Sequence, residues 1–208
     1  MKLLILFILS VAIMPINTLA YEIKDSNNKY TYQVDYYESS FPSVDKKIHE
    51  WLDTELEEFK QYENYNDIKN DFYTNYELYS YKNINFLQYT ISSYTGGAHY
   101  GLKAKQFTYD DKGNFLELKD FFNTSEYLEI LSSLSYDELV KLKINEDLSW
   151  LKEGTKPLVD NFSLYYFDEQ GLHLTFPPYQ VAPWASGIIK ITISMDKLSK
   201  LLKPVDNF

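Results

Sequence analysis

The spacing of apolar side chains changes along this chain from the period of a helix to the period of a strand, and this change restricts the fold. Over residues 43–60 apolar side chains recur at three- and four-residue steps, which predicts an amphipathic helix. From residue 76 the period becomes two, which predicts strands at 76–82, 85–94 and 102–109. The apolar stripe of the helix consists of Val44, Ile48, Trp51, Leu52, Leu56 and Phe59.

Weaker signals flank this central pattern. A β-rich run predicts a strand at 29–37, while residues 61–75 fit either a loop or a continuation of the helix. Asp and Asn around Gly113 predict a turn that leads into a short strand at 115–118. Residues 125–146 are predicted to be helical, and Ser135 with Glu138 resembles a capping box that would divide this segment into two helices.

The C-terminal third begins with a predicted hairpin of two strands, 162–167 and 172–176. A strand at 188–194 and a helix at 195–202 complete the chain. Because strand groups and helix groups are segregated, the sequence predicts the α+β class with a mainly antiparallel sheet. It would contain one long N-terminal amphipathic helix, a middle helical segment and a short C-terminal helix.

The first 20 residues have the pattern of a secretory signal peptide. Met1 and Lys2 precede a nearly unbroken apolar run at residues 3–14. The small residues of a signal-peptidase cleavage site follow, ending at Ala20. A membrane span needs roughly 20 apolar residues, so an uncleaved anchor is the weaker alternative. We therefore expect an exported protein, periplasmic or extracellular, without a stable membrane span after cleavage. Residues 21–208 would form a single domain with parts at about 21–95 and 96–208.

Composition excludes several classes of protein. The chain has no cysteine, which rules out disulfides, thiolate metal sites and a cysteine nucleophile, so core packing must stabilise the fold. Its formal net charge is −10, and every basic side chain is lysine. Nucleic-acid binding is therefore not expected, because phosphate recognition favours clustered positive charge and the guanidinium fork of arginine.

Motifs for catalysis or metal binding are also lacking. The three histidines do not have metal-ligand spacing, and no Gly-x-Ser-x-Gly elbow, His-Glu-x-x-His helix or phosphate-binding loop is present. His49 lies on the polar edge of the predicted helix, and His173 is expected on the solvent face of its strand. We expect no cofactor and no metal, and a binding role is favoured over an enzymatic one.

Two loops carry the candidate binding residues. The first, residues 94–101, contains three glycines beside His99, which either caps a carbonyl in a bent strand connection or contacts a partner. The second, residues 177–187, is stiffened by proline and carries Tyr179 and Trp184, which either bind a partner or cover the end of the sheet. The candidate partner-binding residues are His99, Tyr100, Pro178, Tyr179, Gln180, Pro183 and Trp184.

Two segments also resemble a known family. Residues 94–99, Tyr-Thr-Gly-Gly-Ala-His, and residues 161–187, ending in Pro-Pro-Tyr-Gln-Val-Ala-Pro-Trp-Ala-Ser-Gly, resemble the extracytoplasmic domain of RsiV-type anti-sigma factors. The same segments also resemble the accessory region of PdaC-type peptidoglycan deacetylases. The resemblance covers nearly all of the chain after the signal peptide. Gln180 and Trp184 depart from the Glu and Tyr that the family commonly has there.

The resemblance implies a role at the cell wall. In the anti-sigma factors this domain senses lysozyme, and in the deacetylases it accompanies a separate catalytic domain. We expect neither a sigma-binding segment nor a catalytic domain here, so the resemblance implies a binding module that recognises a lysozyme-like lytic enzyme or peptidoglycan. The acidic charge suits a basic partner. The alternative is a cell-wall glycan hydrolase or deacetylase, or the accessory domain of one.

Overall fold

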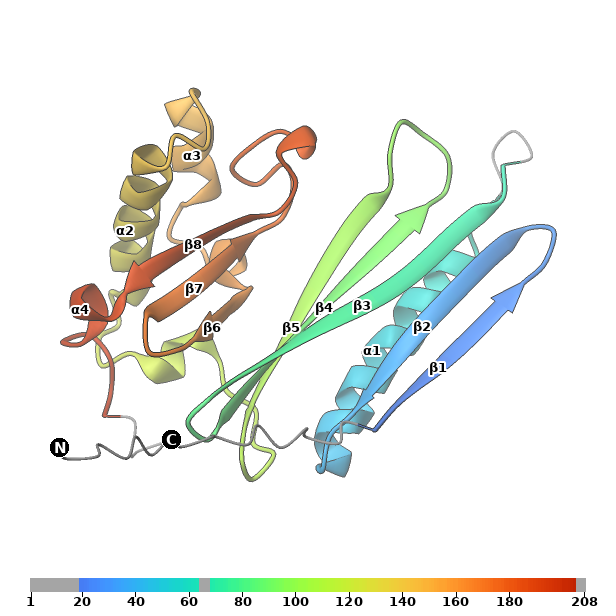
Figure 1. Ribbon diagram of the computed structural model, residues 1–208, viewed down its shortest axis with the longest axis horizontal. Helices are drawn as coiled ribbons and strands as arrows, with labels where there is room; N and C mark the ends of the chain where they lie inside the picture. The colour runs from blue at the N-terminus through green and yellow to red at the C-terminus, as the bar shows by residue number, and fades with distance from the viewer. Residues whose placement is uncertain (1–18, 64–67, 205–208) are drawn as a thin grey trace, which may run out of the picture.

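A five-stranded sheet dominates the N-terminal half of the computed structural model, which describes residues 19–63 and 68–204 (Figure 1). Its strands lie in chain order and pair antiparallel except for β2 and β3, which are parallel. Helix α1 connects this parallel pair, since parallel neighbours need a crossover. The strands are β1 (Leu19–Ser26), β2 (Tyr30–Glu38), β3 (Asn70–Tyr81), β4 (Ile84–Tyr94) and β5 (Gly101–Asp110).

Helix α1 (Pro42–Lys60) covers one face of this sheet and corresponds to the helix expected at 43–60. Pro42 occupies the first helical position, where a missing backbone N–H costs nothing. Trp51 lies at the edge of the apolar stripe and packs edge-on against Tyr89 and Phe107 of the sheet. The stripe side chains Val44, Ile48, Leu52, Leu56 and Phe59 are all buried.

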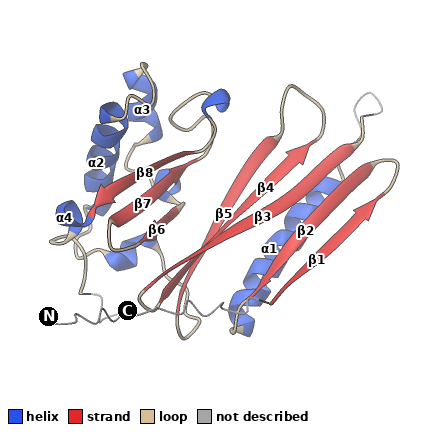
Figure 2. Cartoon of the chain, viewed as in Figure 1, coloured by secondary structure: helices blue, strands red, loops and turns tan. Residues whose placement is uncertain are grey.

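The C-terminal half is built on a three-stranded antiparallel sheet, covered on one side by helices (Figure 2). Its strands are β6 (Tyr165–Phe167), β7 (Gly171–Phe176) and β8 (Ile189–Ser194). The α-helices are α2 (Tyr127–Lys141), α3 (Leu148–Gly154) and α4 (Met195–Leu198), and the 3-10 turns are η1 (Leu118–Phe121), η2 (Val159–Phe162) and η3 (Trp184–Ser186).

Strand β4 takes part in two hydrophobic cores. Leu87 and Tyr89 face α1, whereas Ile84 and Phe86 face the second core, because successive strand residues point to opposite faces. Tyr79 of β3 stacks on Tyr166 of β6 with ring centroids 3.7 Å apart. The smaller sheet thus packs on the part of β3 and β4 nearest their connecting turn.

The predicted fold class is confirmed: both sheets are mainly antiparallel, and the helices are segregated from the strands. The sequence of residues 61–75 fits either a loop or a continued helix, and in the structure β3 begins within them at Asn70. The sequence missed β1, which includes the last two residues of the predicted signal peptide, and it missed α3. The other 18 residues of that peptide lie outside the described part of the chain.

Three local predictions were wrong. The strand expected at 115–118 is reduced to a single bridge between Tyr109 and Phe115, because the chain turns into η1. The proposed capping box fails because Ser135 is fully buried inside the uninterrupted helix α2. The final helix, α4, ends at Leu198 instead of continuing to residue 202.

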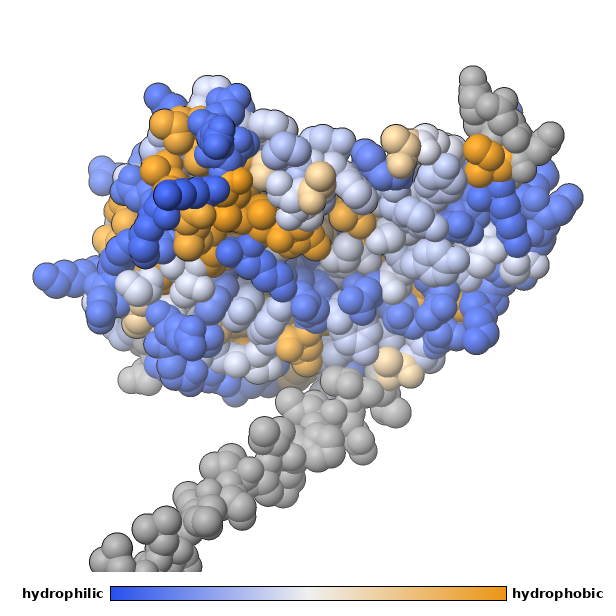
Figure 3. Space-filling model, turned by 45° about the horizontal axis from the view of Figure 1, so that its top comes forward, coloured by the Kyte–Doolittle hydropathy of each residue, from blue (hydrophilic) through white to orange (hydrophobic). Residues whose placement is uncertain are grey.

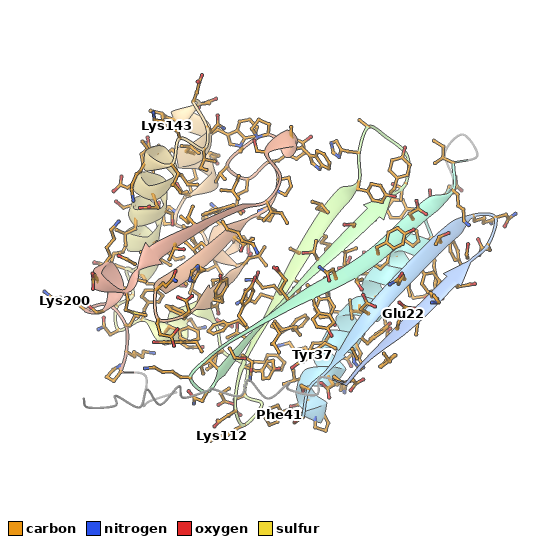
Figure 4. The ribbon with its side chains drawn as sticks, viewed as in Figure 1. Glu22, Tyr37, Phe41, Lys112, Lys143 and Lys200 are labelled. Atoms are coloured by element: carbon orange, nitrogen blue, oxygen red, sulfur yellow. The ribbon has the colours of Figure 1, made fainter. Side chains whose placement is uncertain are left out.

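A buried pair of phenols gives the first testable prediction. Tyr37 and Tyr109 lie between the sheet and α1 with their hydroxyl oxygens 2.9 Å apart, and Figure 4 labels Tyr37. Replacing Tyr109 by Phe leaves the Tyr37 hydroxyl without this partner, so the free energy of unfolding should fall by about 1–2 kcal/mol. Urea denaturation at pH 7 measures this loss.

The same pair should make stability depend on alkaline pH. Burial raises the pKa of Tyr109 and of Tyr37 above the ordinary value. The unfolded chain ionises both phenols above roughly pH 10, while the folded protein keeps them neutral, so stability present below that pH is lost above it. The free energy of unfolding of Tyr109→Phe should fall less steeply between pH 9 and 11 than that of the unmodified protein. An equal slope in both proteins would contradict this assignment.

Candidate functional site

The loop between β4 and β5 holds His99 at the surface. Gly96 and Gly97 adopt positive φ angles of 96° and 123°, which side chains rarely allow. Tyr94 Oη donates a hydrogen bond to the Gly97 carbonyl at 3.0 Å, and the rings of Tyr94 and Tyr100 lie 5.3 Å apart. These contacts turn the chain sharply and leave the His99 side chain exposed.

The second loop, which joins β7 to β8, is fixed from within. Val181 is fully buried, and Gln180 Nε2 donates to the carbonyls of Gly154 and Asn161, each at 2.9 Å. Trp150 of α3 donates from Nε1 to the Tyr179 carbonyl at 3.0 Å. Tyr179 itself has a φ of 72° and a side chain that is 56% exposed. Helix α3 therefore supports the loop and presents Tyr179 outward.

The two loops meet through three side chains, His99, Tyr179 and Trp184, which we call the aromatic bridge. The His99 ring stacks on Trp184 with centroids 4.4 Å apart and an interplanar angle of 17°. His99 Nε2 lies 3.1 Å from Tyr179 Oη, and Nδ1 lies 2.9 Å from the Tyr100 carbonyl. Side chains of the β4–β5 loop and of the β7–β8 loop, which contains η3, approach each other at the top of Figure 4.

This network assigns the hydrogen positions of a neutral His99. A carbonyl oxygen only accepts, so Nδ1 must donate to Tyr100, and Nε2 is left to accept from the Tyr179 hydroxyl. Trp184 Nε1 is buried and has no hydrogen-bond partner among the described residues. An unpaired buried donor costs roughly 1–3 kcal/mol, so this indole N–H makes the bridge less stable than a fully hydrogen-bonded arrangement would be.

The structure divides the seven predicted site residues. It brings His99, Tyr179 and Trp184 together, and Pro183 is exposed beside them. Tyr100 instead turns to Asp71, with 3.2 Å between Oη and Oδ2. The two remaining predicted residues lie elsewhere: Gln180 donates to the carbonyls of Gly154 and Asn161, and Pro178 lines a groove beside the bridge.

The prediction for His173 was wrong. His173 is half-buried, stacks on Tyr166 at 4.3 Å and places Nε2 2.8 Å from Asp168 Oδ2. His49 is also partly buried, with Nε2 3.4 Å from Glu38 Oε1. Within residues 19–63 and 68–204, no group of three or more His, Asp or Glu side chains is arranged to hold a metal ion.

Beside the aromatic bridge lies a groove that the sequence did not reveal. It has a volume of about 350 Å³ and follows the outer face of β3, β4 and β5 beyond the area covered by the smaller sheet. A narrower extension reaches inward beneath Pro177 and Pro178 to Thr175. Strand alternation alone could have identified one lining face, which includes Tyr73, Asn75, Thr90, Ser92 and Leu102.

The surface near the bridge changes character between the two halves. Figure 3 shows apolar side chains gathered over the C-terminal half, whereas the N-terminal half of the same face is mainly polar. The exposed apolar residues of the C-terminal half include Leu148, Leu158, Val159 and Tyr179. No helix in the described part of the chain is long and apolar enough to span a membrane.

Comparison with known proteins finds a matching family model and similar sequences. Residues 119–196 match the family described as "Protein of unknown function (DUF3298)". The chain is 32% identical over 183 residues to the peptidoglycan-N-acetylmuramic acid deacetylase PdaC of Bacillus subtilis, which covers 84% of this chain and 39% of PdaC. It is 29% identical over 119 residues to the anti-sigma-V factor RsiV of the same organism, covering 53% and 39% of the two chains. The matches thus span well under half of either relative.

Solved structures show the same fold over nearly the whole chain. A DUF3298 family protein from Pseudomonas aeruginosa PAO1 superimposes with a TM-score of 0.67 at 14% identity, covering 90% of this chain and 95% of the other. A family member from Bacteroides fragilis NCTC 9343 gives 0.62 at 15% identity, covering 90% and 94%. The chain is therefore a homologue of PdaC and RsiV, as its sequence motifs imply, with a DUF3298 match at residues 119–196.

Proposed function

We propose that this protein is an exported binding module of the cell envelope, and that it recognises a lysozyme-like lytic enzyme through the aromatic bridge. The observation that carries this proposal is the meeting of the two loops: His99 stacks on Trp184 at 4.4 Å while Tyr179 stays 56% exposed. Stiff aromatic side chains on well-supported loops are the usual centres of protein interfaces. Helix α3 and buried Val181 provide that support here.

The charge and the relatives point to the class of partner. PdaC is named for peptidoglycan, and the resemblance to RsiV-type factors implies a lysozyme-like enzyme as partner. A formal charge of −10 favours encounter with a cationic protein by raising the association rate. The signal-peptide pattern at residues 1–20 supports export to the compartment where such an enzyme acts.

Calorimetric titration of the purified protein with lysozyme tests the proposal. We expect binding that weakens as salt rises, because part of the attraction is between opposite net charges. Trp184→Ala should reduce the affinity at least about tenfold, since a central aromatic contributes about 2 kcal/mol or more to an interface. Tyr62→Ala is the matched control: Tyr62 is 61% exposed, follows α1 and lies outside the bridge, so affinity should stay unchanged.

Each other outcome has a defined meaning. No heat with lysozyme at either salt concentration would overturn the proposed partner. Retention on purified sacculi, lost with Trp184→Ala, would indicate that the bridge binds peptidoglycan directly. Release of product from labelled glycan, abolished by His99→Ala, would indicate a hydrolase or deacetylase instead.

A further inference from the structure

The groove beside the aromatic bridge ends at a buried hydroxyl that has no hydrogen-bond partner. Thr175 is only 8% exposed and lines the inner extension together with Leu164, Pro177 and Pro178. Its backbone N–H bonds to the Leu164 carbonyl, but Oγ1 has no partner among the described residues. Buried polar atoms are almost always paired, so this hydroxyl indicates a place for a ligand's polar group.

The outer part of the groove offers further unused hydrogen-bonding groups. Asn75, Thr90 and Ser92 line it, and none of these side chains bonds to another described residue. The Tyr73 ring, 37% exposed, and Ile188, 44% exposed, add apolar surface on either side. Hydroxyl and amide groups beside an aromatic ring match a ligand that carries many hydroxyls and has apolar ring faces.

The charges in the groove do not favour an ionic ligand. Three charged residues line it: Glu77 and Lys190 pair with each other, with 3.1 Å between Nζ and Oε2, and Lys103 pairs with Glu55 of α1. Lys190 Nζ also lies 3.3 Å from Tyr79 Oη. With its charges neutralised internally, the groove favours an uncharged molecule over a phosphate or carboxylate.

The position of the groove also argues against a peptide. Extended peptides add to the free edge of a sheet, where backbone groups are unpaired. This groove lies on the face of the sheet, where β4 is hydrogen-bonded on both sides, while the edge strand β5 contributes Leu102 to its outer part. Recognition on this face would therefore come from side chains, as is usual for sugars.

We propose that this groove is a saccharide subsite, separate from the aromatic bridge, that binds an uncharged oligosaccharide with Thr175 Oγ1 bonding to a hydroxyl or N-acetyl group. It extends the proposed function, because a glycan and a protein partner would use different residues of one module. The two sites adjoin, since Pro178 lines the groove and Tyr179 follows it in the bridge.

Calorimetry with the tetramer of N-acetylglucosamine tests the subsite, with cellotetraose as the probe that lacks N-acetyl groups. We expect the purified protein to bind at least one of them, and Thr175→Val to weaken that binding about tenfold. Removing an unpaired buried hydroxyl should not lower the melting temperature, and this separates a ligand-binding role from a structural one.

Thr108→Val is the matched control. Thr108 is also buried, but its Oγ1 accepts a hydrogen bond from Gln106 Nε2 at 2.7 Å. This variant should melt earlier and bind sugar normally. Absence of binding to both tetramers, or wild-type affinity in Thr175→Val, would overturn the subsite and leave lysozyme binding at the bridge untouched. If Trp184→Ala loses lysozyme binding but still binds the sugar, the result supports the aromatic bridge as the protein-binding site and leaves the groove as the sugar-binding site.

Discussion

Replacing Gly154 by alanine should destabilise the protein by about 3 kcal/mol, because overpacking against a fixed backbone is costly. A Cβ at this position, the end of α3, would meet the Gln180 carbonyl oxygen and the Val181 side chain. The Gln180 side chain in turn bonds to the Gly154 carbonyl, so the helix end and the loop are held in contact from both sides. Thermal and urea unfolding measure the loss.

The consequence should extend to binding. Any shift that relieves the clash moves Gln180 and with it Tyr179, so affinity for the partner should fall along with stability. Gly101→Ala is the control: the nearest atom to its Cβ would be Ser93 Oγ at 3.6 Å, an ordinary contact, and stability should change by less than about 0.5 kcal/mol. A wild-type melting temperature in Gly154→Ala would show that α3 does not support the loop as described.

Truncating Phe86 to alanine is the second large effect that we expect. Phe86 is fully buried, and its ring centroid lies 5.9 Å from those of Phe121 and Tyr165 and 6.1 Å from that of Phe167. Removing a buried aromatic ring costs about 3–5 kcal/mol through lost burial and the cavity left behind. The adjacent variant Leu87→Ala, on the α1 face, should cost about 2–5 kcal/mol.

Together these neighbouring variants test whether residues 21–208 form one domain. Phe86 belongs to the core under the smaller sheet and Leu87 to the core under α1, but they are consecutive in β4. If the chain unfolds as one unit, both variants should lower the same single calorimetric transition. Two resolved transitions, each sensitive to only one variant, would divide the chain into two independently unfolding parts.

The spacing of apolar residues predicted the elements that have one clear apolar side. It failed where tertiary contacts determine whether a segment is a strand, a turn or a helix. Strands β4 and β5 and helix α1 follow the spacing of their apolar side chains closely. Strand β1 was missed because its first two residues fall in the predicted signal peptide, which leaves only the short alternating run at residues 21–24 as a strand signal. The Ser135–Glu138 pattern suggested a helix start, but burial of Ser135 keeps α2 continuous.

Helix α3 did carry a readable start signal. Asp147 accepts hydrogen bonds from the backbone N–H groups of Ser149 and Trp150, as a helix N-cap should. Its seven residues are too few to show a helical period.

The candidate site was predictable as two loops but not as one surface. Glycine and proline content identified both loops, whereas the pairing of His99 with Tyr179 joins residues 80 positions apart. The direction of Gln180 depends on carbonyls of α3 and η2, whose positions no local pattern reveals. Thr175 looked like an ordinary strand threonine, because an unpaired hydroxyl is visible only once its surroundings are known.

The three tryptophans provide the most direct measurement of the central claim, since each indole N–H gives its own signal in a ¹⁵N–¹H NMR spectrum. Trp184 Nε1 has no partner among the described residues, Trp150 Nε1 bonds to the Tyr179 carbonyl, and Trp51 of α1 packs against the sheet. On titration with lysozyme, recognition at the aromatic bridge predicts the largest shift for Trp184, a smaller one for Trp150 and none for Trp51. Saturation with the Trp184 signal unmoved would contradict the account.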